Sequence, residues 1–155
     1  MLMGFLTQNA LALPSSSYVD DNGKSWTGRR TETLNGFNVK VEWSVYDIAN
    51  NPEEFAWAGV SLAGDNYAYV YKVTNLSGGD IGSFYMLDNP GDTEMIDWSS
   101  RINGTQAVGT GMMPDSPSLQ QGEWIWSSEF STAGTSSAYL IYGSLYAPKV
   151  GAYLV

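Results

Sequence analysis

The amino-acid sequence predicts an all-β fold, an antiparallel β-sandwich of the jelly-roll or immunoglobulin-like kind. Apolar side chains recur at every second residue in several short segments, and Ser, Thr, Asn and Gly gather between those segments. No segment of ordinary helix length has the spacing of an amphipathic helix. A length of 155 residues suits one domain. We therefore expect a single β-sandwich domain over residues 14–155, preceded by a separate apolar segment over residues 1–13.

The clearest expected strand is Phe37–Tyr46, because its residues alternate between apolar and polar side chains. The apolar positions, which should face the core, are Phe37, Val39, Val41, Trp43 and Val45. The polar positions, which should face solvent, are Asn38, Lys40, Glu42 and Ser44. A strand with one buried face is therefore expected here.

A second strand, Asn66–Thr74, places Tyr67, Tyr69, Tyr71 and Val73 on one face. The turn residues Asn75–Asp80 follow it, and Ile81–Leu87 resumes as a strand, which predicts a hairpin. Further strands are expected at Gln121–Phe130 and Ser137–Tyr142, separated by the Ser/Thr/Gly stretch 131–136. Weaker patterns indicate short strands at Ser16–Val19 and Glu94–Trp98, and a single helical turn at Asn51–Trp57.

The first thirteen residues carry no charge, although the whole chain has a formal net charge of −9. Ala10-Leu11-Ala12 matches a signal-peptide cleavage site, but no Lys or Arg precedes Lys24, so the basic start of a signal peptide is missing. The segment is too short for a membrane span, which needs about 20 apolar residues. The alternatives are a residual signal peptide, a buried first strand and a strand lent to a neighbouring molecule. We favour an assembly strand, with these apolar side chains available for burial: Met1, Leu2, Met3, Phe5, Leu6, Leu11 and Leu13.

Composition removes several classes of function. The chain has no Cys and no His, so thiol chemistry and a Ser-His-Asp triad are excluded. Its acidic balance argues against nucleic acid as a partner, because a polyanion is bound by a basic surface. Charged residues make up only 15% of the chain, and the remaining polarity comes from Ser, Thr, Asn and Gly, which suits an extracellular β-protein. We expect no enzyme activity.

One segment resembles the start of a calcium loop. Asp20, Asp21 and Asn22 offer oxygen ligands before a turn glycine, and Asp65, Asp88 and Asp92 are further candidates. The glutamate that a calcium loop needs at its twelfth position is replaced by Thr31. An ordinary polar turn is therefore favoured, and no other cofactor is expected.

The aromatic residues have two possible interpretations. Trp124 and Trp126 share a strand face, and such rows either form a core or stack on sugars; we favour the core. Trp26 and Trp98 lie in turn-rich surroundings and are the better candidates for glycan stacking. Asn75-Leu-Ser and Asn103-Gly-Thr match the N-glycosylation pattern, and both are expected in loops.

Glutamates are the remaining catalytic candidates, because glycosidases of the jelly-roll kind use two carboxyl groups about 5–10 Å apart. Glu123 and Glu129 share one strand, where six residues separate them by about 20 Å, which is too far. A working pair would need Glu42 opposite one of them in a cleft. Ordinary outward-facing carboxylates are the favoured interpretation.

Two segments carry a family resemblance. The first is Tyr67–Phe84, in which an aromatic strand runs into the text TNLSGGDI and a further strand; the second is Tyr139–Gly151. Together they resemble exported bacterial β-sandwich proteins of the PEP-CTERM type. The resemblance implies secretion and sorting to the cell surface or extracellular matrix. That family's tail, a Pro-Glu-Pro motif with an apolar span and an Arg cluster, does not occur in this sequence, so a processed form or a relative without the tail is expected.

These observations favour a structural subunit of an extracellular filament or surface assembly, a pilin-like homopolymer built by β-strand donation. Copies of the same chain are the expected partners, with glycans as further partners and no membrane span in this chain. The alternative is a secreted carbohydrate-binding β-sandwich module. An exposed, coplanar row of Trp and Tyr would distinguish the alternative.

Overall fold

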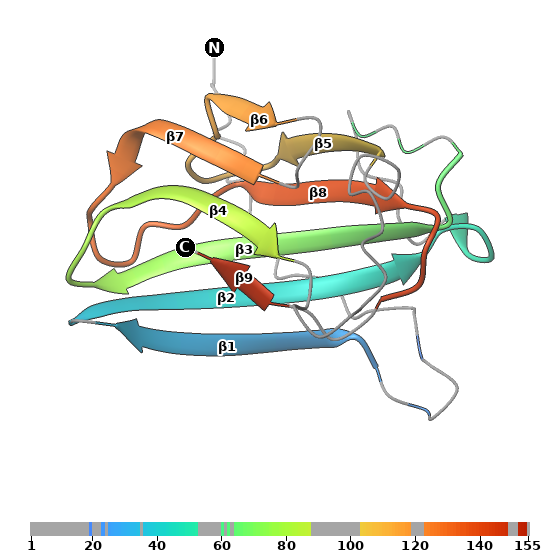
Figure 1. Ribbon diagram of the computed structural model, residues 1–155, viewed down its shortest axis with the longest axis horizontal. Helices are drawn as coiled ribbons and strands as arrows, with labels where there is room; N and C mark the ends of the chain where they lie inside the picture. Colours follow the sequence, from blue (N-terminus) through green and yellow to red (C-terminus); the bar gives the residue numbers. More distant parts are fainter. Residues whose placement is uncertain are drawn as a thin grey trace, which may run out of the picture.

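The chain folds into β-structure (Figure 1). The structure is a computed structural model that describes residues 19, 23, 25–34, 36–52, 60, 62, 64–87, 103–118, 123–148 and 152–154. Within these residues it contains nine strands and no α-helix, and all strand pairs are antiparallel. The all-β prediction is therefore confirmed.

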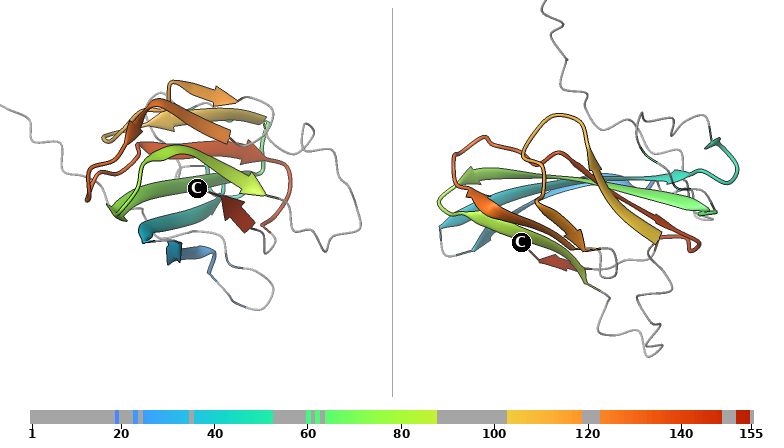
Figure 2. Two further views of the ribbon diagram at one scale, coloured as in Figure 1. Left: turned by 60° about the vertical axis from the view of Figure 1, so that its left-hand side comes forward. Right: turned by 90° about the horizontal axis from the view of Figure 1, so that it is seen from above.

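The strands form two sheets. The larger one has the order β1-β2-β3-β8-β5 and consists of Thr27–Leu34, Phe37–Asp47, Tyr67–Ser77, Tyr139–Ser144 and Asn103–Val108. The smaller one has the order β6-β7-β4-β9 and consists of Ser116–Ser118, Glu123–Phe130, Ile81–Leu87 and Ala152–Leu154. Figure 2 shows the two sheets as separate layers. Neither sheet closes on itself, so each has two edge strands.

One apolar core is shared by both sheets. Val41, Tyr71 and Val73 of the larger sheet pack in one buried cluster with Phe84 and Trp124 of the smaller sheet. The predicted apolar face of β2 is confirmed, since Val39, Val41 and Val45 are buried there, with Phe37 and Trp43 packed against the cluster. Alternation at period two is thus what directs these side chains inward.

The opposite face of the larger sheet carries a second, smaller cluster. Tyr46, Val70, Tyr139 and Ile141 are buried there, and Ile48, Val60 and Leu62 of the β2–β3 connection pack against them. Ser44 was predicted to face solvent and is instead buried. The prediction missed this because the alternation within β2 does not show that the following connection folds back over its polar face.

The predicted hairpin over Tyr67–Leu87 is wrong, because β3 belongs to the larger sheet and β4 to the smaller one. The chain turns between the sheets at Gly78, whose φ is 91°. The connection from β7 to β8 also passes between the sheets. The β1–β2 pair is a true hairpin, since Leu34 pairs with Phe37 and only two residues, an Asn-Gly pair in the sequence, separate them.

Several strands were not expected from the sequence, namely β1, β5, β6 and β9. Of the weaker expectations, Glu94–Trp98 lies outside the described residues. Residues 16–18 and 53–59 of the other two also lie outside them, and Val19 forms an isolated bridge with Ser25. Within the described part of the chain, no helix reaches the length and apolar content of a membrane span.

Candidate functional site at the sheet edges

The predicted aromatic rows form the core. Trp124 and Trp126 are 0% and 2% exposed, so their core interpretation is confirmed. The Trp124 Nε1–H donates to the carbonyl of Gln106 at 3.2 Å, and the Trp126 Nε1–H donates to the carbonyl of Met112 at 3.1 Å. Trp26 is half-buried and packs against the core, so it offers only part of a stacking surface; Trp98 lies outside the described residues.

Asn75 has a structural position that its sequence pattern did not indicate. It lies within β3 rather than in a loop, and its side chain is 0% exposed. Its Nδ2 group donates to the carbonyls of Gly79 and Phe130, at 2.6 and 2.9 Å. The glycosylation proposed at Asn75 is therefore corrected, because a buried amide offers no room for a glycan. Asn103 also lies in a strand, at the start of β5, where it pairs with Gly143.

The metal candidates do not come together in the described part of the chain. Asp20, Asp21, Asn22, Asp88 and Asp92 lie outside it, and no group of three or more acidic side chains is found within it. Asp65 is buried and its carboxylate lies against the backbone of Gly143, where no space for a side chain remains. Asp65 is thus enclosed by protein rather than presented at a surface.

The carboxylate pair needed for glycoside hydrolysis does not form around Glu42. Its neighbours Val41 and Trp43 point toward the smaller sheet, so Glu42 points to the opposite side of the larger sheet. Glu123 and Glu129 belong to β7 of the smaller sheet. The larger sheet therefore stands between Glu42 and both of them. Glu42 forms an ion pair with Lys40 at 3.0 Å instead.

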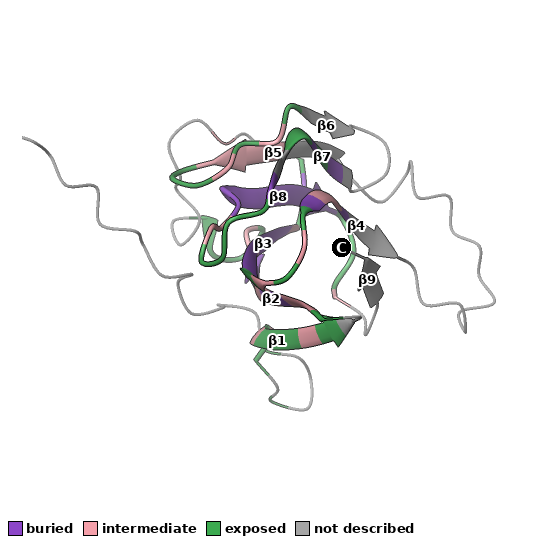
Figure 3. Ribbon diagram, turned by 90° about the vertical axis from the view of Figure 1, so that its left-hand side faces the viewer, coloured by how far each residue is buried: buried purple, intermediate pink, exposed green. Residues whose placement is uncertain are grey.

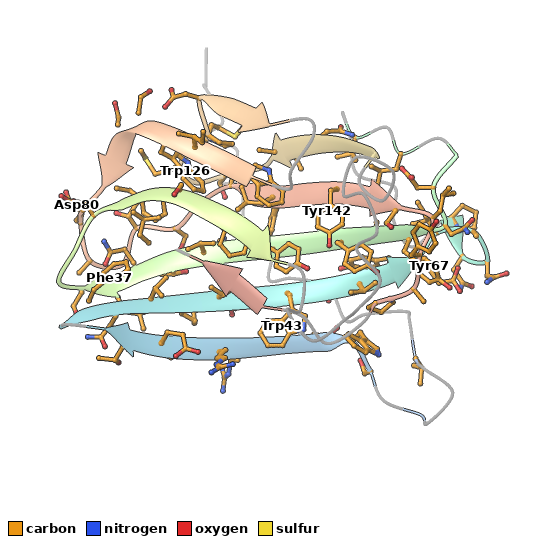
Figure 4. The ribbon with its side chains drawn as sticks, in the orientation of Figure 1. Phe37, Trp43, Tyr67, Asp80, Trp126 and Tyr142 are labelled. Carbon is orange, nitrogen blue, oxygen red and sulfur yellow. The ribbon has the colours of Figure 1, made fainter. Side chains whose placement is uncertain are left out.

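Tyrosines fill the centre of the shared core. The rings of Tyr69 and Tyr142 are stacked, with centroids 4.7 Å apart, and Tyr71 lies 6.1 Å from Tyr142 (Figure 4 labels Tyr142). Burial raises the pKa of the Tyr71 hydroxyl, although its hydrogen bond with Tyr142 lowers it in part. Burial also raises the pKa of Tyr142, and the neighbouring Tyr71 and Tyr69 add to this rise. These hydroxyls stay neutral at physiological pH and act as packing groups.

The edges of the two sheets differ in how they oppose the addition of another strand. Strand β1 is an edge of the larger sheet, and Arg30 and Glu32 point from it toward the side of the smaller sheet, as their partners Val41 and Val39 do. These two side chains form an ion pair and are 66% and 43% exposed. Inward-pointing charges of this kind are a common protection of edge strands.

Two further edges carry other protections. The pairing of β5 with β8 shifts register between Asn103 and Gln106, and such irregularities interrupt the regular edge. Strand β6 has only three residues, and Pro117 at its centre has no N–H to donate. Both features make these edges poor templates for another strand.

The fourth edge, β9, is as short as β6, but it has no other protection in the residues that the structure describes. Its sequence, Ala-Tyr-Leu, contains neither a charge nor a proline, and it pairs on one side with β4. In Figure 1, β9 lies in front of β2, and no described strand of the smaller sheet lies in front of β1, which Figure 3 shows as mostly exposed. Among the residues that the structure describes, the smaller sheet is thus one strand short of the larger one on this side.

A half-buried aromatic group lies on the larger sheet beside β9. Trp43 packs against the core without being fully covered, and it lies between β9 and β1 in the view of Figure 4. The indole of Trp43 lies directly on the backbone of Gly28 in β1, which leaves no space for a side chain there. Phe37, which is also half-buried, lies at the other end of β2 against Gly79 of the β3–β4 connection. The strip defined by Trp43 and Gly28 is called the open strip below.

The predicted assembly strand, with Met1, Leu2, Met3, Phe5, Leu6, Leu11 and Leu13, lies outside the described residues. The sequence predicted a donor strand but no edge strand at residues 152–154. Strand β9 was missed because three residues are too few for a periodic pattern.

Comparisons with known proteins give no further guide, since no protein-family model, no curated protein and no solved structure matches the chain.

Proposed function

We propose that this protein is a structural subunit of an extracellular filament or surface assembly, and that copies join by β-strand addition at the free edge of β9. In this proposal the two sheets are an incomplete β-sandwich, of the jelly-roll or immunoglobulin-like kind. The unprotected β9 edge beside the open strip is the observation that carries the proposal. Met1–Leu13 of a neighbouring copy is the proposed donor.

The physical gain comes from two sources. A strand placed beside β9 would lie opposite β1 and cover the exposed part of Trp43, and full burial of one large apolar side chain contributes about 1.5–3 kcal/mol. The donor backbone would also pair with the unpaired backbone groups of β9. Among the described residues of a separate molecule neither gain is made, so both favour association.

The ion pair of Arg30 and Glu32 restricts which strand fits. Both groups would lie beneath a strand opposite β1, and covering charged groups without polar partners is costly. The proposed donor is apolar at both ends but contains Thr7, Gln8 and Asn9 in its middle. These residues offer hydrogen-bond partners for the ion pair, whereas a uniformly apolar strand would not.

The contact is of the head-to-tail type, because the donor segment and the β9 edge are different surfaces of one chain. Contacts of this type produce open filaments when the rotation between copies does not close a ring. An extracellular location is part of the proposal: the chain is free of Cys and rich in Ser, Thr and Gly, and it resembles exported proteins of the PEP-CTERM type.

Cross-linking with introduced cysteines tests the proposal, and the absence of native Cys keeps the background clean. Two single-cysteine variants, Leu6→Cys in the donor and Tyr153→Cys in β9, are mixed under oxidising conditions, with neighbouring donor positions tested in turn. We expect a mixed disulfide between the two variants, and removal of Met1–Leu13 should abolish the filaments seen by electron microscopy.

The matched control replaces Tyr153→Cys by Thr31→Cys, which places the thiol at an exposed position of the protected strand β1. The proposal is wrong if Thr31→Cys cross-links to the donor as readily as Tyr153→Cys. It is also wrong if mass spectrometry shows that the assembled protein lacks Met1–Leu13, or if the full-length chain stays monomeric.

A further inference from the structure

The outer face of the larger sheet, the face turned away from the smaller sheet, brings charged side chains from three strands together. The strand register aligns Arg29 of β1 with Glu42 of β2, and Glu42 with Lys72 of β3. Lys40 lies two residues from Glu42 on the same face of β2 and pairs with it at 3.0 Å. Residues directly opposite on adjacent strands lie about 5 Å apart, so these four side chains form one compact group, called the basic patch below.

The charge of the basic patch is opposite to that of the chain. It contains three of the seven Lys and Arg residues and one carboxylate, so it carries a net charge of +2 in a chain of net charge −9. The rest of the chain therefore carries −11. The sequence alone did not reveal this, because Arg29, Lys40 and Lys72 are far apart along the chain.

The cations of the basic patch are presented outward rather than neutralised in place. Glu42 pairs with Lys40, and within the described residues no ion pair is found for Arg29 or Lys72. Arg29 is exposed, and the Lys40 side chain is 31% exposed.

The Lys72 ammonium is held in position, because it lies 4.8 Å from the centroid of the buried Tyr139 ring. The face is polar on the Lys40 side of the patch, where Thr31 and Thr74 lie opposite Lys40, and on the Lys72 side it continues into the buried cluster around Tyr139. A positively charged surface of this kind suits a partner that presents carboxylates.

We propose that the basic patch is a lateral contact that binds the acidic surface of a second copy of this chain. The surplus of 11 negative charges outside the patch supplies the complementary surface. This contact does not rest on strand addition, since it uses the opposite side of the larger sheet. If the protein forms filaments, this contact would join neighbouring filaments side by side.

The salt dependence of this contact has a characteristic form. At very low salt the two net charges of −9 repel each other over distances of about 30 Å. At intermediate salt this long-range repulsion is screened, whereas ion pairs at contact persist. At about 1 M salt the pairs themselves are screened. Association should therefore be strongest at intermediate salt, whereas an apolar contact would strengthen steadily.

The test compares full-length variants by sedimentation velocity over this salt range. Arg29→Gln/Lys72→Gln should weaken lateral association by about tenfold or more, which corresponds to about 1.4 kcal/mol. Glu42→Gln should strengthen it, because it raises the charge of the patch. The matched control is Arg101→Gln/Lys149→Gln, which removes the same number of positive charges from residues outside the patch and should not weaken association.

Electron microscopy separates this proposal from strand addition. If filaments form, Arg29→Gln/Lys72→Gln should give single filaments where the unaltered chain gives bundles. If no filaments form, the salt-dependent association of single molecules still tests the basic patch. An equal effect of Arg101→Gln/Lys149→Gln, a steady rise of association with salt, or a protein monomeric at every salt concentration would overturn the proposal. So would binding of alginate, a polyuronate probe, through the patch without self-association.

Discussion

The side-chain amide of Asn75 in β3 donates a hydrogen bond to the carbonyl of Phe130 in β7, at 2.9 Å, and so joins the two sheets. The same amide donates to the carbonyl of Gly79 in the β3–β4 connection. The backbone of Asn75 adds two bonds to the β7–β8 connection, through the carbonyl of Thr135 and the N–H of Gly134. One buried residue thus holds two of the connections that pass between the sheets, β3–β4 and β7–β8.

Replacing this amide should destabilise the fold strongly. We expect Asn75→Ala to lower the free energy of unfolding by about 2–4 kcal/mol, because one buried and one partly buried carbonyl group lose their donor. The matched control is Asn66→Ala, which removes one amide-to-carbonyl bond, to Leu145, at an exposed position and should cost about 1 kcal/mol or less. Urea denaturation measures both values, and equal costs would contradict the role given to Asn75.

The turn at Gly78 should tolerate no side chain. A Cβ atom there would collide with the backbone carbonyl of Gly36 in the β1–β2 turn, and the positive φ already disfavours other residues. Gly134 has a similar φ of 86° but open space around it, so Gly134→Ala should cost only the conformational strain of about 1–2 kcal/mol. We expect Gly78→Ala to cost clearly more in thermal denaturation. If the two costs agree, the packing of one turn on the other is unimportant.

Asp115 should make stability depend on acid pH. Its Oδ2 atom accepts hydrogen bonds of 2.6 Å from the hydroxyl and the N–H of Ser127. Both bonds lower the pKa of Asp115, and the bond from the hydroxyl has the larger effect. The unfolded chain has the higher pKa, so the stabilisation is complete above the ordinary pKa of an aspartate and is lost as the pH falls through the lowered value. Asp115→Asn and Ser127→Ala should both reduce this acid-dependent loss. A melting temperature that falls with pH as steeply in both variants as in the unaltered protein would refute the assignment.

The buried tyrosines should make stability depend on alkaline pH. Burial raises the pKa values of Tyr71 and Tyr142 in the folded protein, whereas the unfolded chain ionises near the ordinary value of 10.0. Their contribution is therefore complete below that value and is lost as the pH rises above it. Tyr142→Phe should lose less stability than the unaltered protein between neutral and alkaline pH, and Tyr146→Phe at an exposed position is the matched control. Chemical denaturation at a series of pH values measures the difference, which should be absent for Tyr146→Phe.

Apolar periodicity predicted the inner part of the fold and failed at its margins. Strand β2 was predicted almost to the residue, because Val39, Val41 and Val45 are buried and the residues between them are more polar. Strand β1 was missed because its sequence, TGRRTETL, contains one large apolar residue. An edge strand that faces solvent on both sides needs no periodic pattern, so its sequence carries little signal.

The candidate sites could be located only from the register between strands. Turn residues at Asn75–Asp80 correctly indicated a change of direction, but they could not show that the chain leaves one sheet for the other. The basic patch depends on Arg29, Glu42 and Lys72 being adjacent across strands, and the open strip depends on Trp43 lying on Gly28. Neither relationship can be derived from the local sequence.

The order of the larger sheet also determines when the protein can finish folding. Its middle strand, β3, lies between β2, which precedes it, and β8, which is made near the end of the chain, so that Tyr71 pairs with Leu140. Pairings between such distant residues form slowly. A nascent or truncated chain that ends before Tyr139 leaves one side of β3 without its partner. Such intermediates should depend on chaperones during synthesis and accumulate as aggregates when release is premature.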